Sequence, residues 1–155
     1  MNHLQMKSRA RGFSLVEVLV ALVVMAVGML GVCSLFVVSF HSGATAVNRI
    51  NAVNLAAELA DRIRANHLAR GAYAGAGANN DCMGATKQCS AQDLAAYDLY
   101  GWYDTMNKTL PGSPSATVTV TPGGTGVPDT YLININWSEP HEDMSYTLLT
   151  KVSTT

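Results

Sequence analysis

The stretch Arg11-Gly12-Phe13-Ser14-Leu15-Val16-Glu17 opens an apolar run that extends to Phe40, and this run decides the fold. Residues 13–40 carry one formal charge, that of Glu17. A helix over this range would be about 42 Å long at about 1.5 Å per residue, which exceeds a hydrocarbon core of about 30 Å. The run therefore predicts a helix that can span a membrane.

The flank before the apolar run is basic. Lys7, Arg9 and Arg11 lie in residues 1–12, which contain no acidic residue. Positive charge keeps a flank in the cytoplasm, so we expect the chain after the helix to lie outside the cytoplasm. An ordinary secretory signal is cut after its apolar region, whereas a cut between Gly12 and Phe13 would remove only the basic leader.

These residues together resemble the class III signal of type IV prepilins. That signal is a short basic leader ending in Gly, a Phe that becomes the N-methylated first residue, and a Glu at the fifth position of the mature chain. Gly12, Phe13 and Glu17 stand at those places. The resemblance implies cleavage after Gly12 by a prepilin peptidase and methylation of Phe13. The alternative is a simple signal anchor in which Glu17 lies at headgroup depth and pairs with Arg11 or lipid.

Glu17 is the unusual residue of the apolar run, because a carboxylate within such a helix is costly and usually marks function. After cleavage, Phe13 would carry a positive amine at the membrane face. An ion pair between Glu17 and the new N-terminus of a neighbouring subunit would relieve the free-energy cost of a buried charge. We therefore expect Glu17 to guide docking during assembly.

The charge of the remaining chain limits the classes of function. After Arg70 the chain has three Lys and eight acidic residues, so the head is acidic. Nucleic-acid binding needs a basic stripe, so we expect no nucleic-acid partner and disfavour a DNA-receptor pilin. Sequence motifs of a catalytic nucleophile, a phosphate-binding loop or a dinucleotide site are absent. We expect neither an enzyme nor a cofactor.

Three cysteines and one acidic cluster remain to be interpreted. Cys33 lies in the apolar run, where we expect a packing role. Cys82 and Cys89 lie in a Gly- and Ala-rich loop, residues 71–89, that would be exported to a disulfide-permissive compartment, and their spacing is a poor zinc signature. We predict that these two are bridged. Residues 138–143 contain three acids that could bind calcium, namely Glu139, Glu142 and Asp143. A solvated acidic turn is the preferred interpretation, and we expect no metal site.

Beyond Phe40 the helical pattern continues in amphipathic form and is predicted to end near Leu68. Its apolar stripe at helical spacing consists of Ala52, Leu55, Ala56, Leu59 and Ile63. A second helix is predicted over residues 91–108, with Ser90 and Asp93 as its capping box. Its predicted buried face consists of Ala95, Leu99, Trp102 and Met106.

After residues 110–114 the period of the pattern changes to two. Alternating residues near 118–120, 131–137 and 146–152 predict three short strands, joined by turns at 122–129 and 138–143 into an antiparallel meander. We predict an α+β fold in which the long N-terminal helix packs its stripe on this small sheet, with the second helix in the connection between them.

The segment Ala56-Ala-Glu-Leu-Ala-Asp-Arg-Ile-Arg-Ala-Asn66 resembles PilV-type minor pilins of type IV pili, and residues 97–112 resemble a later stretch of the same proteins. The resemblance implies the type IV pilin fold and a minor pilin that helps to initiate or prime assembly of the pilus (fimbria), supporting adhesion and twitching motility. Its implied partners are the prepilin peptidase, other minor pilins, the major pilin and the inner membrane.

The implied domains are a leader (residues 1–12), a transmembrane and filament-core helix (13–40) and a periplasmic head (41–155). Before assembly the protein would cross the inner membrane once, and afterwards it would belong to the cell-surface pilus. A minor pseudopilin of a type II secretion system has the same leader and fold and is the alternative function. A further alternative, without a pilin function, is a bitopic membrane protein that keeps its leader.

Overall fold

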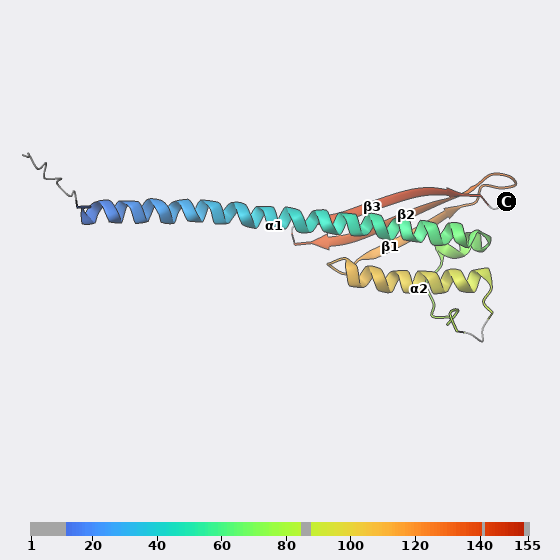
Figure 1. The fold of residues 1–155 in the computed structure, drawn as a ribbon. Helices are drawn as coiled ribbons and strands as arrows, with labels where there is room; N and C mark the ends of the chain where they lie inside the picture. Colours follow the sequence, from blue (N-terminus) through green and yellow to red (C-terminus); the bar gives the residue numbers. More distant parts are fainter. Residues whose placement is uncertain (1–11, 85–87, 141, 154–155) are drawn as a thin grey trace, which may run out of the picture. The chain divides into compact units, whose positions relative to one another are not determined.

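The computed structural model describes residues 12–84, 88–140 and 142–153, so the expected leader lies outside the described residues except for Gly12. The backbone divides into two compact units between Gly43 and Ala44. The elements (Figure 1) are, in chain order, α1 (Leu15–Ala65), the 3-10 helix η1 (His67–Ala74), α2 (Ala91–Thr109), β1 (Ser115–Thr121), β2 (Asp129–Glu139) and β3 (Glu142–Val152).

In the first unit, α1 leaves its apolar side chains uncovered. The exposed fractions of its large hydrophobic residues run from 46% at Val18 to 84% at Leu15. Among the described residues, α1 is the one helix long and apolar enough to cross a membrane, with a mean hydropathy of 2.7 over its most apolar window. A helix that is apolar all round is stable only when lipid or other protein covers it.

In the second unit, called the head below, α1 is amphipathic as predicted. Its buried residues are Ala52, Leu55, Ala56, Leu59, Ala60 and Ile63. The helix ends at Ala65, three residues earlier than predicted, and η1 then carries the chain to Ala74. Within η1, Arg70 has a φ of 46°, a backbone conformation that interrupts helical geometry. The loop therefore begins at Gly75 and not at Gly71.

The prediction of α2 is confirmed. Ser90 accepts a hydrogen bond from the backbone N–H of Asp93, and the Asp93 side chain accepts one from the backbone N–H of Ser90. This reciprocal capping box satisfies two donors that a helix start leaves free. The four buried residues of α2 are those predicted from spacing, Ala95, Leu99, Trp102 and Met106.

The three strands form the predicted antiparallel meander in the order β1-β2-β3. Ile133 in the central strand lies opposite Val118 on one side and Leu148 on the other. Two turns differ from the prediction. Asp129 begins β2 and does not lie in the preceding turn, and β2 and β3 continue pairing as far as Glu139 and Glu142, which shortens the acidic turn.

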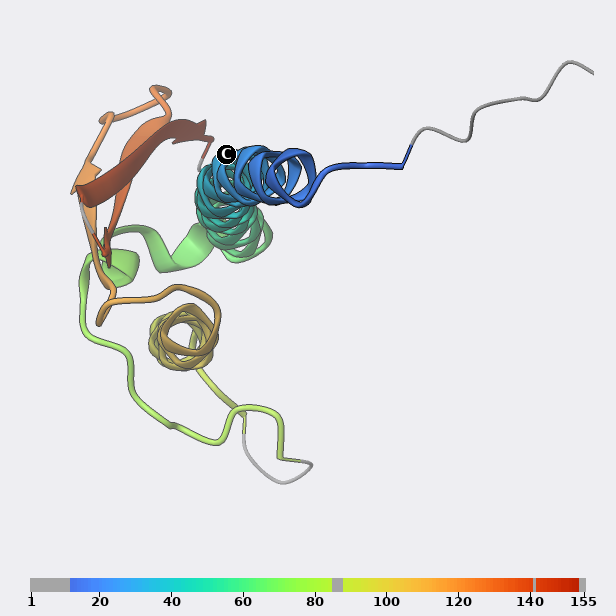
Figure 2. The same cartoon turned by 90° about the vertical axis from the view of Figure 1, so that its left-hand side faces the viewer.

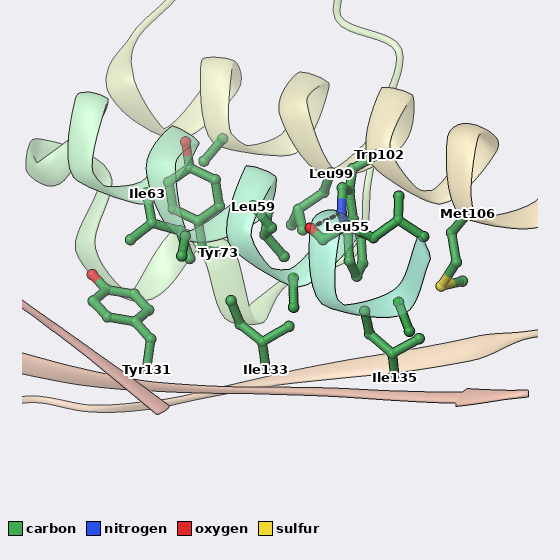
Figure 3. Packing of buried hydrophobic residues seen from close by; sticks show 14 of the residues in the cluster. Leu55, Leu59, Ile63, Tyr73, Leu99, Trp102, Met106, Tyr131, Ile133 and Ile135 are labelled. Carbon is green, nitrogen blue, oxygen red and sulfur yellow. Dashed lines mark hydrogen bonds between the residues drawn. The ribbon is translucent and has the colours of Figure 1, made fainter. Parts of the chain in front are cut away.

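The core lies between the sheet and the two helices, with α1 and α2 on the same side of the curved sheet (Figure 2). Tyr131, Ile133 and Ile135 of β2 point toward the helices, and all three are fully buried (Figure 3). Trp102 of α2 is also fully buried, and its indole N–H donates to the Leu55 carbonyl of α1 at 2.8 Å. This bond gives the buried indole a partner and joins the two helices.

Replacement of Leu59 by Ala should destabilise the head by about 2–5 kcal/mol, because it removes a fully buried side chain and leaves a cavity. Denaturation of the detergent-solubilised protein, followed by tryptophan fluorescence, measures this difference. The matched control is Leu68→Ala, since Leu68 is 67% exposed and should change the free energy of unfolding by less than about 0.5 kcal/mol. Equal effects of the two substitutions would contradict the described core.

Candidate functional site

The N-terminal end of α1 brings together the residues of the predicted processing signal. Gly12 and Phe13 precede the helix, and Glu17 lies in its first turn, where a carboxylate interacts favourably with the helix dipole. The backbone N–H of Glu17 donates to the Ser14 hydroxyl oxygen at 3.1 Å, so Ser14 caps the helix. Sequence reasoning missed this cap, although the Ser-x-x-Glu spacing signals it.

The Glu17 side chain lies on an otherwise apolar face of α1, formed with Phe13, Val18, Ala21, Leu22 and Met25. Within the described part of the chain, its carboxylate has no ion-pair partner. A carboxylate in apolar surroundings needs a cation to offset its desolvation. The face can therefore bind a positively charged group from another chain once the helix is covered.

A polar cluster joins α1, η1 and α2 near the C-terminal end of α1. The Arg62 guanidinium bridges Glu58 on its own helix at 2.6 Å and Asp98 of α2 at 3.1 Å. The Tyr73 hydroxyl donates to Asp98 at 2.7 Å, and burial raises the pKa of Tyr73, so the hydroxyl keeps its proton. The Glu58–Arg62 pair follows from its i,i+4 spacing on one helix, whereas the contacts with Asp98 and Tyr73 do not, because helical spacing says nothing about the facing elements.

A second ion pair fixes η1 to the start of β2. Arg70 donates to both carboxylate oxygens of Asp129 at 2.9 Å, and the backbone N–H of Gly123 donates to the same carboxylate at 2.9 Å. Asp129 is 1% exposed. The hydrogen bonds from Arg70 and Gly123 lower the pKa of Asp129 to about 2. The buried Tyr131 hydroxyl close to this pair has no hydrogen-bond partner among the described residues.

The sequence suggested that Glu139 is a solvated member of an acidic turn, and this prediction is wrong. Its carboxylate accepts hydrogen bonds from Thr45 and Asn48 of α1 and from the Trp137 indole N–H. The nearby Asp143 instead accepts from Ser138, and no three His, Cys, Asp or Glu side chains converge among the described residues. The described residues therefore contain no side-chain cluster that supports calcium binding. Glu139 instead connects the sheet to α1.

Cys82 and Cys89 are joined by a disulfide, with their Cα atoms 5.7 Å apart, and Cys33 is a free, exposed cysteine in α1. The chain before the bridge is docked on α2, since the Ala78 N–H donates to the Ala96 carbonyl at 2.9 Å. Gly77 lies so close to α2 that an added Cβ would be 2.5 Å from the Tyr100 nitrogen. The disulfide therefore closes a short loop that follows a segment fixed to the helix.

Two family models match this chain. Residues 34–100 match the model described as Type IV pilin Tt1218, and residues 7–32 match the Prokaryotic N-terminal methylation motif. The second match covers Gly12, Phe13 and Glu17. Comparisons with curated proteins and with solved structures give no match.

An uncovered apolar N-terminal helix, continued into a head that packs on a small antiparallel sheet, defines the class of pilin-like proteins. The two family matches narrow this class, because the chain carries a type IV pilin domain after an N-terminal methylation motif. The methylation motif implies processing by a prepilin peptidase and incorporation into a pilus.

The Asp129 contacts predict a pH dependence of stability. The pKa of Asp129 is lowered from 3.8 to about 2, so its contribution is present above about pH 4 and is lost as the pH falls toward 2. Asp129→Asn should therefore destabilise the head at pH 7, and the difference from the wild type should shrink toward pH 2. Denaturation curves of the detergent-solubilised protein at several pH values measure both quantities.

Asp61→Asn is the matched control, because the Asp61 side chain is 74% exposed and pairs with Arg64 on the same helix. Its effect on stability should be small at every pH. A difference between wild type and Asp129→Asn that stays constant from pH 7 to pH 2 would show that the Arg70–Asp129 pair does not act as described.

Proposed function

We propose that this chain is a type IV pilin and a minor subunit that helps to initiate or prime pilus assembly and thereby supports adhesion and twitching motility. The observation that carries the proposal is the uncovered apolar segment of α1, which directly follows the methylation motif and leads into a folded head. Such a helix needs lipid before assembly and other helices afterwards. The resemblance of residues 56–66 to PilV-type minor pilins supports the minor role.

The proposed processing assigns a role to each residue of the motif. Residues 1–12 form the leader, which a prepilin peptidase removes after Gly12 before Phe13 is methylated. Before assembly, residues 13–40 cross the inner membrane once, and residues 41–155 form a head in the periplasm. During assembly, residues 13–40 enter the filament core. Glu17 pairs with the N-terminal amine of a neighbouring subunit during docking, and the finished pilus lies on the cell surface.

The N-terminal sequence and intact mass of the protein from sheared filaments and from membranes test this processing. The filament fraction should contain a chain that begins at methylated Phe13. The same mass, measured with and without reduction and alkylation, should show Cys82 and Cys89 bridged. A chain that begins at Met1 and occurs only in membranes would overturn the proposal in favour of a signal-anchored protein.

Deletion of the gene tests the role in assembly. Loss of the chain should reduce the number of surface pili and twitching, and expression of the wild-type chain should restore both. The alternative function, a minor pseudopilin of a type II secretion system, predicts intact pili and impaired protein export. Counting pili by electron microscopy and measuring secreted proteins in the same strains separates the two functions.

Glu17→Gln should leave leader removal intact but lower the amount of the chain in sheared filaments by ten-fold or more. The reason is that the neutral amide lacks the charge that attracts the methylated amine of the neighbouring subunit. Quantitative immunoblots of filament and membrane fractions measure the ratio. Asp61→Asn, which removes an exposed carboxylate from the head half of α1, should not change it. Normal incorporation of Glu17→Gln would sink the proposed docking role.

A further inference from the structure

The strand β3 is an edge of the sheet, since the strand order is β1-β2-β3. Its eleven residues pair with β2 without a bulge, from Glu142 opposite Glu139 to Val152 opposite Asp129. An edge strand presents a row of free backbone N–H and C=O groups, and proteins normally protect this row with charges, prolines, bulges or a covering element.

The central part of β3 carries none of the protecting residues. The charged side chains of the strand are at its ends, in Glu142, Asp143 and Lys151. The seven residues between them, Met-Ser-Tyr-Thr-Leu-Leu-Thr (144–150), include no charge, proline or glycine. Such a sequence has a high preference for extended structure and forms a long, regular template for a further strand.

Apolar side chains at this edge are incompletely covered on both faces of the sheet. On the inner face, Tyr146 and Leu148 are half-buried, whereas the inward residues of the central strand are fully buried. On the outer face, Leu149 is 59% exposed and lies opposite Leu132, which is 38% exposed. A strand added to β3 would cover apolar surface on both faces while it satisfies the free backbone groups.

The opposite edge of the sheet is protected. β1 is seven residues long and is bracketed by Pro114 and Pro122, which cannot donate to a ladder. The Tyr103 hydroxyl of α2 donates to the Ala116 carbonyl of β1, and η1 lies in close backbone contact with the same strand. The two edges therefore differ, and only β3 is suited to pairing.

We propose that β3 binds the open edge strand of a different pilin subunit by β-strand addition. This inference rests on the proposed function, because it names the surface by which this minor subunit recognises its partner in the assembly. The partner must present an extended, largely uncharged strand at an unprotected sheet edge. Backbone hydrogen bonds would provide the affinity, and Leu149 with Tyr146 and Leu148 would select apolar side chains on the added strand.

A second copy of this chain does not fit the edge. In the head, β3 runs in the same direction as α1. Glu139, which lies beside the start of β3, contacts Thr45 of α1. Thr150, near the end of β3, contacts Arg64, which lies later in α1. Antiparallel pairing of two β3 strands would make the two head helices antiparallel, and their chains would continue toward residue 43 from opposite ends. Two subunits of one filament, held by one membrane before assembly, cannot adopt this arrangement. Parallel subunits with their helices on the same face of the joined sheets, as a shared helical filament core requires, would bring β3 against β1, which is the protected edge.

A photo-crosslinking amino acid in place of Ser145 tests the inference in the full-length chain, expressed in cells that make pili. After irradiation, sheared filaments should contain a crosslink between position 145 and a strand of another pilin, identified by mass spectrometry of the joined peptides. The pair Thr147→Lys and Leu149→Lys should lower the yield of this crosslink ten-fold or more, since it places two charges in the middle of the edge.

The matched control is the pair Thr117→Lys and Thr119→Lys, which adds the same charges with the same spacing on the exposed face of β1. It should leave the crosslink unchanged, and protease resistance of both variants verifies that the head is folded. A crosslink to a second copy of this chain would overturn the choice of partner. Absence of any crosslink from filaments that contain the chain with methylated Phe13 would overturn the inference and leave the proposed function standing. Absence of the chain from filaments would overturn both.

Discussion

The head depends on the burial of one apolar stripe of α1, from Ala52 to Ile63, against the inward side chains of β2 and the facing side of α2. Every large buried apolar residue of α2 and of β2 contributes to the same cluster, so the sheet and the short helix share one core. The helix is apolar on all sides in its first part and amphipathic in its second, where the stripe forms its buried face. The change in pattern marks where the helix becomes part of the folded head.

Polar contacts determine where the sheet lies along this stripe. Near the start of the head, Glu139 accepts from Thr45 and Asn48, and near its end Arg64 donates to Thr150 at 2.8 Å. The Arg70–Asp129 pair then fixes the chain that leaves α1 to the first residue of β2. Hydrophobic burial alone would allow the sheet to slide along the helix, because it has little directional preference. Contacts at both ends prevent this.

The elements of the fold were predictable because their signals are local. The spacing of Leu55, Leu59 and Ile63 reveals a helix face, and the alternation from Tyr131 to Trp137 reveals a half-buried strand. The contacts between elements were not predictable in the same way. Arg70 lies close to the predicted end of the first helix and Asp129 in a predicted turn. The two are 59 positions apart, and neither pattern indicates a contact with the other. Glu139 is predicted to be solvated for the same reason: its acidic neighbours indicate a turn, while its partners on α1 lie more than 90 positions earlier. At the N-terminal site, the motif residues could be found because they are adjacent in sequence.

The long separation of these contacts also sets the order in which the head can form. Thr45 and Arg64 leave the ribosome early, but their partners Glu139 and Thr150 are made 94 and 86 residues later. Local contacts can build α1 and α2 at once, whereas the sheet must wait for its final strand. Until β3 has been synthesised, the sheet that covers the stripe of α1 lacks its last strand and the Thr150 contact with Arg64. The last strand thus completes the head, because only a chain that includes β3 can form the whole sheet and the Arg64–Thr150 contact.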